Sequence, residues 1–156
     1  MTAGNYLKND ADYDDTCNPA AHYRTSVGSL YISAAGLLKL GMMLANEGEA
    51  DGVRILDAAT VHEMQVNQRI LPGSTVSCDS PYGLNLYRLT AQDGTLWYGH
   101  QGRWEGLTAD LFYEKGSRTV LLLILNGAKK ETGREINRHA ETAIDFLTAQ
   151  LSPILE

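Results

Sequence analysis

The sequence predicts an α+β protein, in which helices flank an antiparallel β-sheet meander. Two helical patterns of apolar residues come first, strand-like segments follow from about residue 82, and another helical pattern ends the chain. Runs of helices and then strands, with no regular alternation of the two, are typical of this class. The chain length suits one domain over residues 1–156, with residues 1–28 as a loop-rich lead-in.

The composition is that of an ordinary globular protein, with 44% apolar and 21% charged residues. The net charge of −6 argues against phosphate neutralisation, so we expect no nucleic-acid partner. The longest apolar run is far shorter than the roughly 20 residues of a spanning helix, which predicts no membrane segment. The start, MTAGNYLKND, lacks the pattern of a signal peptide.

An acidic stretch lies in the lead-in, with four aspartates between Asp10 and Asp15. Their spacing partly matches a calcium loop, but Asp15 stands where that loop requires glycine and Ala21 stands where it requires glutamate. We therefore predict a solvated acidic loop, and neither a metal nor another cofactor. Cys17 and Cys78 are isolated, so free thiols are expected in preference to a disulfide.

Two helices are predicted before residue 67. Ser33 has the character of an N-cap for a helix to about Glu47, with Gly48 as its C′ residue. Asp51-Gly52 marks a turn, and Asp57 is placed to cap a short helix that ends near residue 66. Residues 68–80 are expected to form an irregular loop.

The strand-like segments are separated by turn-forming residues. Residues 119–125 form an unbroken apolar run, which favours a strand buried on both faces. The tripeptide His100-Gln101-Gly102 follows the segment 95–99, so we predict a polar rim at a strand end. The segments and their turns are Tyr82–Leu89, Asp93-Gly94, Thr95–Gly99, Gly106–Glu114, Lys115-Gly116-Ser117 with glycine at a positive φ, and Thr119–Leu125.

A last helix is predicted from the capping box Thr132-x-x-Glu135 to about Leu151, with Pro153 ending it. Its inward face is expected to include Ala140, Ala143 and either Phe146 or Leu147.

Three blocks of the sequence occur in a fixed order and resemble one known family. They are Gly28–Leu40, Gly52–Val61 with Met64, and Tyr82-Gly83-Leu84 followed by Gly99-His100-Gln101-Gly102 and the strand ending at Leu125-Asn126. Together they are similar to the C-terminal part of the serine β-lactamase-related family, which includes class C β-lactamases, DD-peptidases and some esterases. The resemblance covers about residues 17–150 and implies a partial β-lactamase/transpeptidase-like fold.

The resemblance also implies a site. His100-Gln101-Gly102 matches the family's third motif, which is Lys or His, any residue, then Gly, on a strand that lines the cleft. His100 would tune the nucleophile region and contact the substrate, while Gly102 would allow close backbone approach. The backbone N–H of Arg103 would be one oxyanion-hole donor. Gln101 and Trp104 are the neighbouring substrate-binding candidates.

Two further motifs of the family are missing. None of the eight serines is followed three residues later by lysine, so the Ser-x-x-Lys nucleophile motif is absent, as is Tyr-x-Asn. We therefore expect the C-terminal portion of a longer serine hydrolase, inactive alone, whose substrate would be a β-lactam, a D-alanyl peptide or an ester. In the full family fold, N-terminal strands continue the sheet and a first helix covers its outer face. Their loss would leave an exposed sheet edge or face, which predicts a homo-oligomer, with a dimer as the simplest form.

Two other functions stay open on the sequence. A non-catalytic module could bind a ligand or partner at the sheet rim, through Tyr87, Trp97, Tyr98 and Trp104. A self-standing hydrolase with an unrecognised nucleophile is the second alternative. The family is often exported, but an export signal would lie upstream of these residues, so the compartment stays open.

Overall fold

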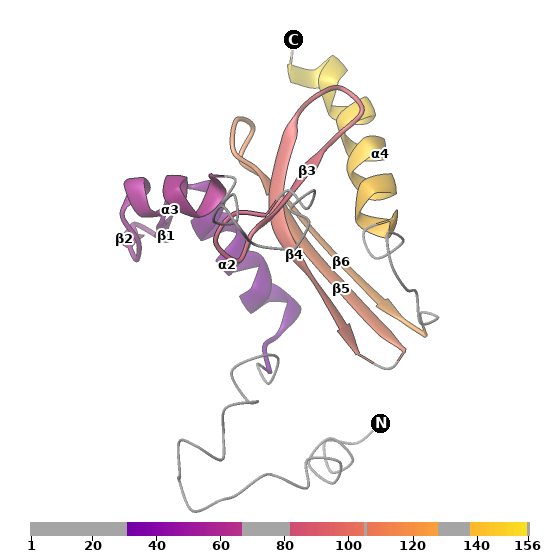
Figure 1. Ribbon diagram of the computed structural model, residues 1–156, viewed down its shortest axis with the longest axis horizontal. Coiled ribbons are helices and arrows are strands. Elements are labelled where there is room, and N and C mark those ends of the chain that lie inside the picture. The colour runs from indigo at the N-terminus through magenta and orange to yellow at the C-terminus, as the bar shows by residue number, and fades with distance from the viewer. Residues whose placement is uncertain (1–30, 67–81, 105, 128–137, 156) are drawn as a thin grey trace, which may run out of the picture. The chain divides into compact units, whose positions relative to one another are not determined.

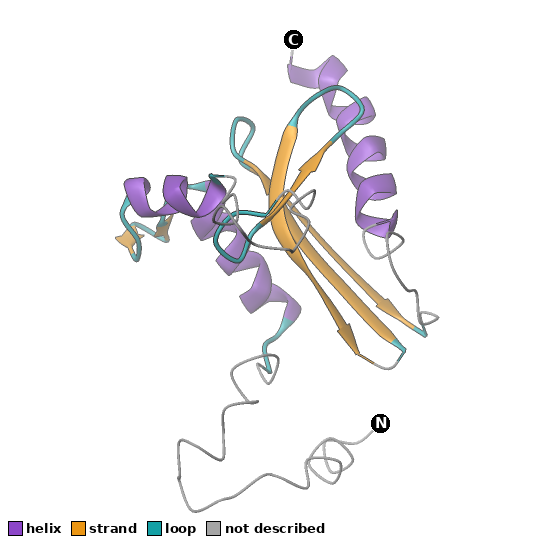
Figure 2. Ribbon diagram, in the orientation of Figure 1, coloured by secondary structure: helices purple, strands orange, loops and turns teal. Residues whose placement is uncertain are grey.

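The computed structural model describes residues 31–66, 82–104, 106–127 and 138–155, without the side chains of residues 104 and 151–155 (Figure 1). Tyr31–Ser33 belong to a different unit from Ala34–Glu156, so the description below concerns only the second unit. Within it the chain is α+β, as predicted, with two antiparallel sheets and three described helices (Figure 2). The predicted loop over residues 68–80, the capping box and both cysteines lie outside the described residues.

The larger sheet is an antiparallel meander of four strands in the order β3-β4-β5-β6. Each strand therefore pairs with its neighbour in the sequence, as turn-forming residues between strands predict. The strands are β3 (Tyr87–Thr90), β4 (Leu96–Trp104), β5 (Leu107–Glu114) and β6 (Thr119–Asn126).

The register of the strands separates two hydrophobic cores. Tyr98 pairs with Tyr113 and Tyr113 with Val120, and all three contribute to one core. The residues one position away, including Trp97 and Phe112, belong to the other core. Successive side chains of a strand point to opposite faces, so the two cores lie on opposite faces of the sheet. We call the face of Tyr98 and Tyr113 the tyrosine face, and the face of Trp97 and Phe112 the tryptophan face.

Helix α2 (Ala34–Ala45) packs on the tyrosine face, against β5 and β6. A methyl group added to Gly41 would lie 2.6 Å from Val120 and 2.9 Å from Leu111, so the helix backbone approaches the sheet closely. The helix ends in a Schellman motif, because Gly48 N–H donates to Met43 O and Glu47 N–H donates to Leu44 O. The prediction for this end was wrong by one residue, since Glu47 has the positive φ of the C′ position.

A small hairpin and a short helix follow α2. Strands β1 (Glu49–Ala50) and β2 (Val53–Arg54) are joined by Asp51-Gly52, both at positive φ, as favoured in two-residue hairpins. Helix α3 (Ala58–Gln65) begins after Asp57, as predicted, although the Asp57 side chain makes no capping hydrogen bond. Val61 is buried in the core of the tyrosine face and anchors this helix to it.

Helix α4 (Arg138–Leu155) packs on the tryptophan face through Ala140 and Ile144. Gln92, in the turn between β3 and β4, donates from both its backbone and side-chain nitrogens to the carboxylate of Asp145 on this helix. The prediction that Pro153 ends the helix was wrong. The helix continues through Pro153 to Leu155, although proline has no N–H and removes one backbone hydrogen bond there.

Several strand predictions need correction. Strand β6 lies at the edge of the sheet and none of its residues is fully buried, so the expectation of burial on both faces was wrong. The segment 82–89 is mostly a turn, with Gly83 N–H donating to Leu86 O, and only its end joins β3. In the β5–β6 turn the positive φ belongs to Arg118 and not to Gly116.

Candidate functional site

His100, Gln101 and Gly102 lie inside β4, so the prediction that they follow the end of a strand was wrong. The strand continues to residue 104 because β5 pairs with it along its whole length. Strand β3 pairs with β4 only as far as Gly99. Residues 100–104 therefore extend past β3, and β5 is their strand partner among the described strands.

The imidazole of His100 is exposed on the tyrosine face and is held by two hydrogen bonds. Its Nε2 lies 2.7 Å from the hydroxyl of Tyr82, and its Nδ1 lies 2.6 Å from the backbone oxygen of Gln101. Tyr82 reaches this position because the turn after it reverses the chain and forms an isolated β-bridge between Tyr82 and Tyr87.

These two hydrogen bonds assign the tautomer of a neutral His100. A carbonyl oxygen can only accept, so Nδ1 carries the proton and donates it to Gln101. Nε2 then has a lone pair, and the Tyr82 hydroxyl donates to it. Burial raises the pKa of Tyr82, and the neighbouring Tyr87 adds to this effect, so Tyr82 keeps its proton at neutral pH.

Gly99 and Gly102 have different reasons to be glycine. A Cβ atom on Gly99 would lie 2.0 Å from the backbone oxygen of Leu111, which the sheet does not permit. A Cβ atom on Gly102 would meet only Ala109, at ordinary distances of 3.5 Å and 3.9 Å. Packing thus explains Gly99 alone. Gly102 is exposed, and the missing side chain leaves the strand backbone open on the same face as His100.

The other predicted site residues lie differently. Gln101 and Arg103 alternate with His100 along β4, so their side chains belong to the tryptophan face, and both are partly buried. This placement separates their side chains from His100, but it does not concern the predicted role of Arg103, which is a backbone N–H. Trp104 is the last residue of β4, and its side chain lies outside the described part.

The aromatic residues proposed for a binding rim divide into two groups. Trp97 is 1% exposed and forms part of the core with Phe112, so it is not available to a binding rim. Tyr87 is partly buried and stands edge-on to Tyr82, with ring centroids 5.4 Å apart. Tyr82 in turn stands edge-on to His100 at 5.8 Å. An aromatic cluster therefore adjoins the histidine, built around a residue that the sequence analysis left out of the site.

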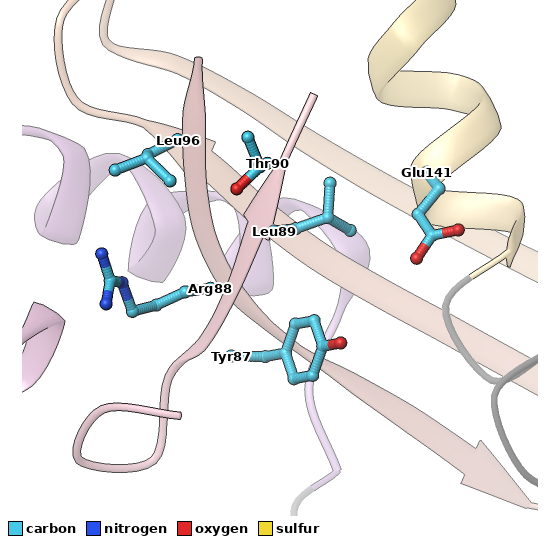
Figure 3. Close-up of a pocket in the computed structure, with 6 residues that line it drawn as sticks. All are labelled: Tyr87, Arg88, Leu89, Thr90, Leu96 and Glu141. Carbon is cyan, nitrogen blue, oxygen red and sulfur yellow. The ribbon is translucent and has the colours of Figure 1, made fainter. Parts of the chain in front are cut away.

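An open depression of about 340 Å³ runs along β3, and its lining comes from both faces of the sheet (Figure 3). Arg88 and Leu96 contribute from the tyrosine face, Tyr87 and Leu89 from the tryptophan face, and Glu141 from α4. His100 is not among its lining residues, so this depression is separate from the predicted motif.

Two residues near the motif were missed by the sequence analysis. Tyr82 was noted for its block but not for its contact, because the turn that carries it to His100 leaves no spacing signal. Asp110 is fully buried and lies opposite Gln101 in the register of β4 and β5. An acidic residue within the alternating apolar positions of β5 is the signal that could have indicated it.

Comparisons with known proteins do not assign a family, since no family model and no curated protein matches the chain. In the described residues, no helix is long and apolar enough to cross a membrane. The same residues contain no group of three histidine, cysteine or acidic side chains that could hold a metal ion.

Proposed function

We propose that the chain is the C-terminal portion of a β-lactamase-related serine hydrolase and forms the rim of an acyl-transfer site. The observation that carries this proposal is the exposure of His100 and Gly102 on one face of β4, in the segment that extends past β3. The resemblance of the sequence blocks adds to it, and so does the position of α4 on the other face, which leaves His100 uncovered by the last helix.

The proposed chemistry is acyl transfer to a serine supplied by the Ser-x-x-Lys part of the family. The lysine amine of that motif would take the serine proton as the serine oxygen attacks the carbonyl carbon of a β-lactam, D-alanyl peptide or ester. The leaving nitrogen or oxygen would then accept that proton. Water would then release the acyl group. The backbone N–H of Arg103 would stabilise the oxyanion, and the open backbone at Gly102 would let the substrate approach β4. The ring of His100, fixed by two hydrogen bonds, would place a polar group beside the reacting carbonyl.

The test begins with the coding DNA upstream of codon 1. An in-frame Ser-x-x-Lys followed by Tyr-x-Asn is expected there, and the joined protein should hydrolyse a chromogenic β-lactam or p-nitrophenyl acetate. Gly102→Ala in the joined protein should lower kcat without loss of stability, whereas Val53→Ala, on the exposed strand β2, should leave kcat unchanged. Turnover by the present chain alone that depends on one of its own serines would instead support a self-standing hydrolase.

A binding module without catalysis is the second candidate, and the aromatic cluster of Tyr82, Tyr87 and His100 is the observation that favours it. Aromatic side chains are common in the linings of ligand-binding sites. In that case the joined gene would lack the nucleophile motif, and Tyr82→Ala would weaken ligand binding with no reaction to affect.

A further inference from the structure

The two outer strands of the four-stranded sheet differ in length and chemistry. Strand β3 has four residues and includes the charged Arg88. Strand β6 has eight residues, Thr119 to Asn126, with six consecutive apolar residues between them and no charge. Short length and charged side chains are the usual protections of an edge strand against pairing with another chain. By this criterion β3 is a protected edge and β6 is not.

The contacts of β6 agree with this contrast. All eight of its residues pair with β5 in continuous register, so the strand contains no bulge that would bend its outer edge away. No other strand of the described residues pairs with it. None of its side chains is fully buried, and Ile124 is 47% exposed, whereas four of the eight residues of β5 are buried.

We propose that β6 is the pairing edge of a twofold homodimer, in which β6 of one copy adds to β6 of the second copy in antiparallel orientation. The row of outward backbone N–H and C=O groups on a strand this long is satisfied best by another strand. A second β6 suits it because the two strands carry no charge, so antiparallel pairing sets apolar residues opposite apolar residues. Pairing with β3 of another copy would place Arg88 against this apolar run.

Symmetry restricts the register of such a dimer. In a continuous antiparallel sheet, paired residues lie on the same face, and along β6 the even-numbered residues lie on the tyrosine face. A twofold axis perpendicular to the sheet therefore passes midway between one residue and the same residue of the second copy, so that this residue pairs with its own copy. Leu122 and Leu123 are the two central positions. The resulting sheet has eight strands and ends in β3 on both sides.

The test compares lysine substitutions at two exposed apolar positions. Ile124→Lys places a charge in the paired strand. Val53→Lys places one on a residue that is 62% exposed and lies on β2, outside the four-stranded sheet. We expect sedimentation velocity to show a dimer for the wild type and for Val53→Lys. Ile124→Lys should raise the dimer Kd by at least tenfold, while circular dichroism shows the same folded spectrum for both variants.

Hydrogen exchange locates the interface. The amides of β6 should become more protected as the protein concentration rises from below to above the dimer Kd, and those of β3 should not change. A wild-type monomer at all concentrations, a dimer that Ile124→Lys leaves intact, or concentration-dependent protection of β3 would each overturn the proposal. Open-ended polymers would also overturn it, because they indicate pairing of β6 with β3. These results do not depend on hydrolase activity, so a failed dimer leaves the proposed function to its own test. The dimer requires in addition that no strand of an upstream hydrolase part pairs with β6.

Discussion

The hydroxyl of Tyr82 lies 2.7 Å from Nε2 of His100 and donates a hydrogen bond to it, while Nδ1 donates to the carbonyl of Gln101. The first prediction follows from this arrangement. At a pH where His100 is neutral, nitrogen-15 NMR should show the proton on Nδ1. Tyr82→Phe removes the donor to Nε2, so the Nε2 resonance should move downfield, while the proton stays on Nδ1 because the carbonyl of Gln101 still accepts it.

Tyr87→Phe is the matched control for this measurement. It keeps the ring that stands edge-on to Tyr82 and leaves the hydroxyl of Tyr82 in place. The Nε2 resonance of His100 should therefore not change in this variant. A wild-type protein with the proton mainly on Nε2 would contradict the assigned hydrogen bonds.

The second prediction uses the two glycines of β4. Gly99→Ala should lower the free energy of unfolding by about 2 kcal/mol or more, because the new methyl group meets the backbone of β5. Gly102→Ala should change it by less than about 0.5 kcal/mol, since the space there is open. Urea unfolding monitored by circular dichroism measures both values, and equal destabilisation would show that Gly102 is also required for packing.

The third prediction concerns the buried hydrogen bond between α3 and the sheet. Gln65 Nε2 donates to the Tyr113 hydroxyl over 3.1 Å, and both residues are buried. Gln65→Ala leaves the hydroxyl without this donor and should cost about 1–3 kcal/mol of unfolding free energy. A double-mutant cycle with Tyr113→Phe should give a coupling of about 1 kcal/mol. A coupling near zero would show that packing alone joins α3 to Tyr113.

The same tyrosine gives a fourth prediction, at alkaline pH. Burial raises the pKa of Tyr113 to about 12, against a smaller opposing effect of the hydrogen bond from Gln65. The folded pKa lies above the unfolded value of about 10, so the unfolded state loses its proton first. Stability should therefore fall as the pH rises from about 10 to about 12. Tyr113→Phe should make this fall shallower, which unfolding curves across the range would measure.

The fifth prediction concerns acid. Burial raises the pKa of Glu114, but hydrogen bonds from Ser117 and from the Gly116 N–H outweigh this effect, and the pKa is lowered. A lowered folded pKa gives stability that is present above the unfolded pKa and is lost as the pH falls. Glu114→Gln should therefore reduce the decline of stability below about pH 4.3, the usual value for glutamate. An unchanged acid limb would contradict a contribution from this carboxylate to the β5–β6 turn.

The sequence predicts which segments form helices, strands and turns better than it predicts how deeply they are buried or where they end. The turns at Asp51-Gly52 and Asp93-Gly94 were located correctly, because turn chemistry is local. The apolar run of β6 predicted a strand but not its place at the edge of the sheet. An apolar run can form an edge strand or a central strand, because its burial depends on elements that are distant in the sequence. The end of β4 was misplaced for a related reason, because β5 extends the pairing through a glycine-containing polar segment.

The site was predictable only in part. The motif from His100 to Gly102 can be read from the chain, and the structure places His100 and Gly102 on one exposed face. Tyr82 was not predictable, because an irregular turn and not a periodic element carries it to the histidine. The sequence also left the burial of Trp97 undecided, because an aromatic residue in a strand can lie in a core or at a surface.

The separation of the two cores by one sheet has a consequence for damage to the protein. Ala140 and Ile144 hold α4 to one side, and Met43 and Leu44 hold α2 to the other, with only the strands in common. A lesion that detaches α4 would uncover the tryptophan face of the sheet, while α2 still covers the tyrosine face. Such partly unfolded molecules would keep the paired strands but expose Trp97 to water. A change in tryptophan fluorescence would therefore detect them before the sheet itself unfolds.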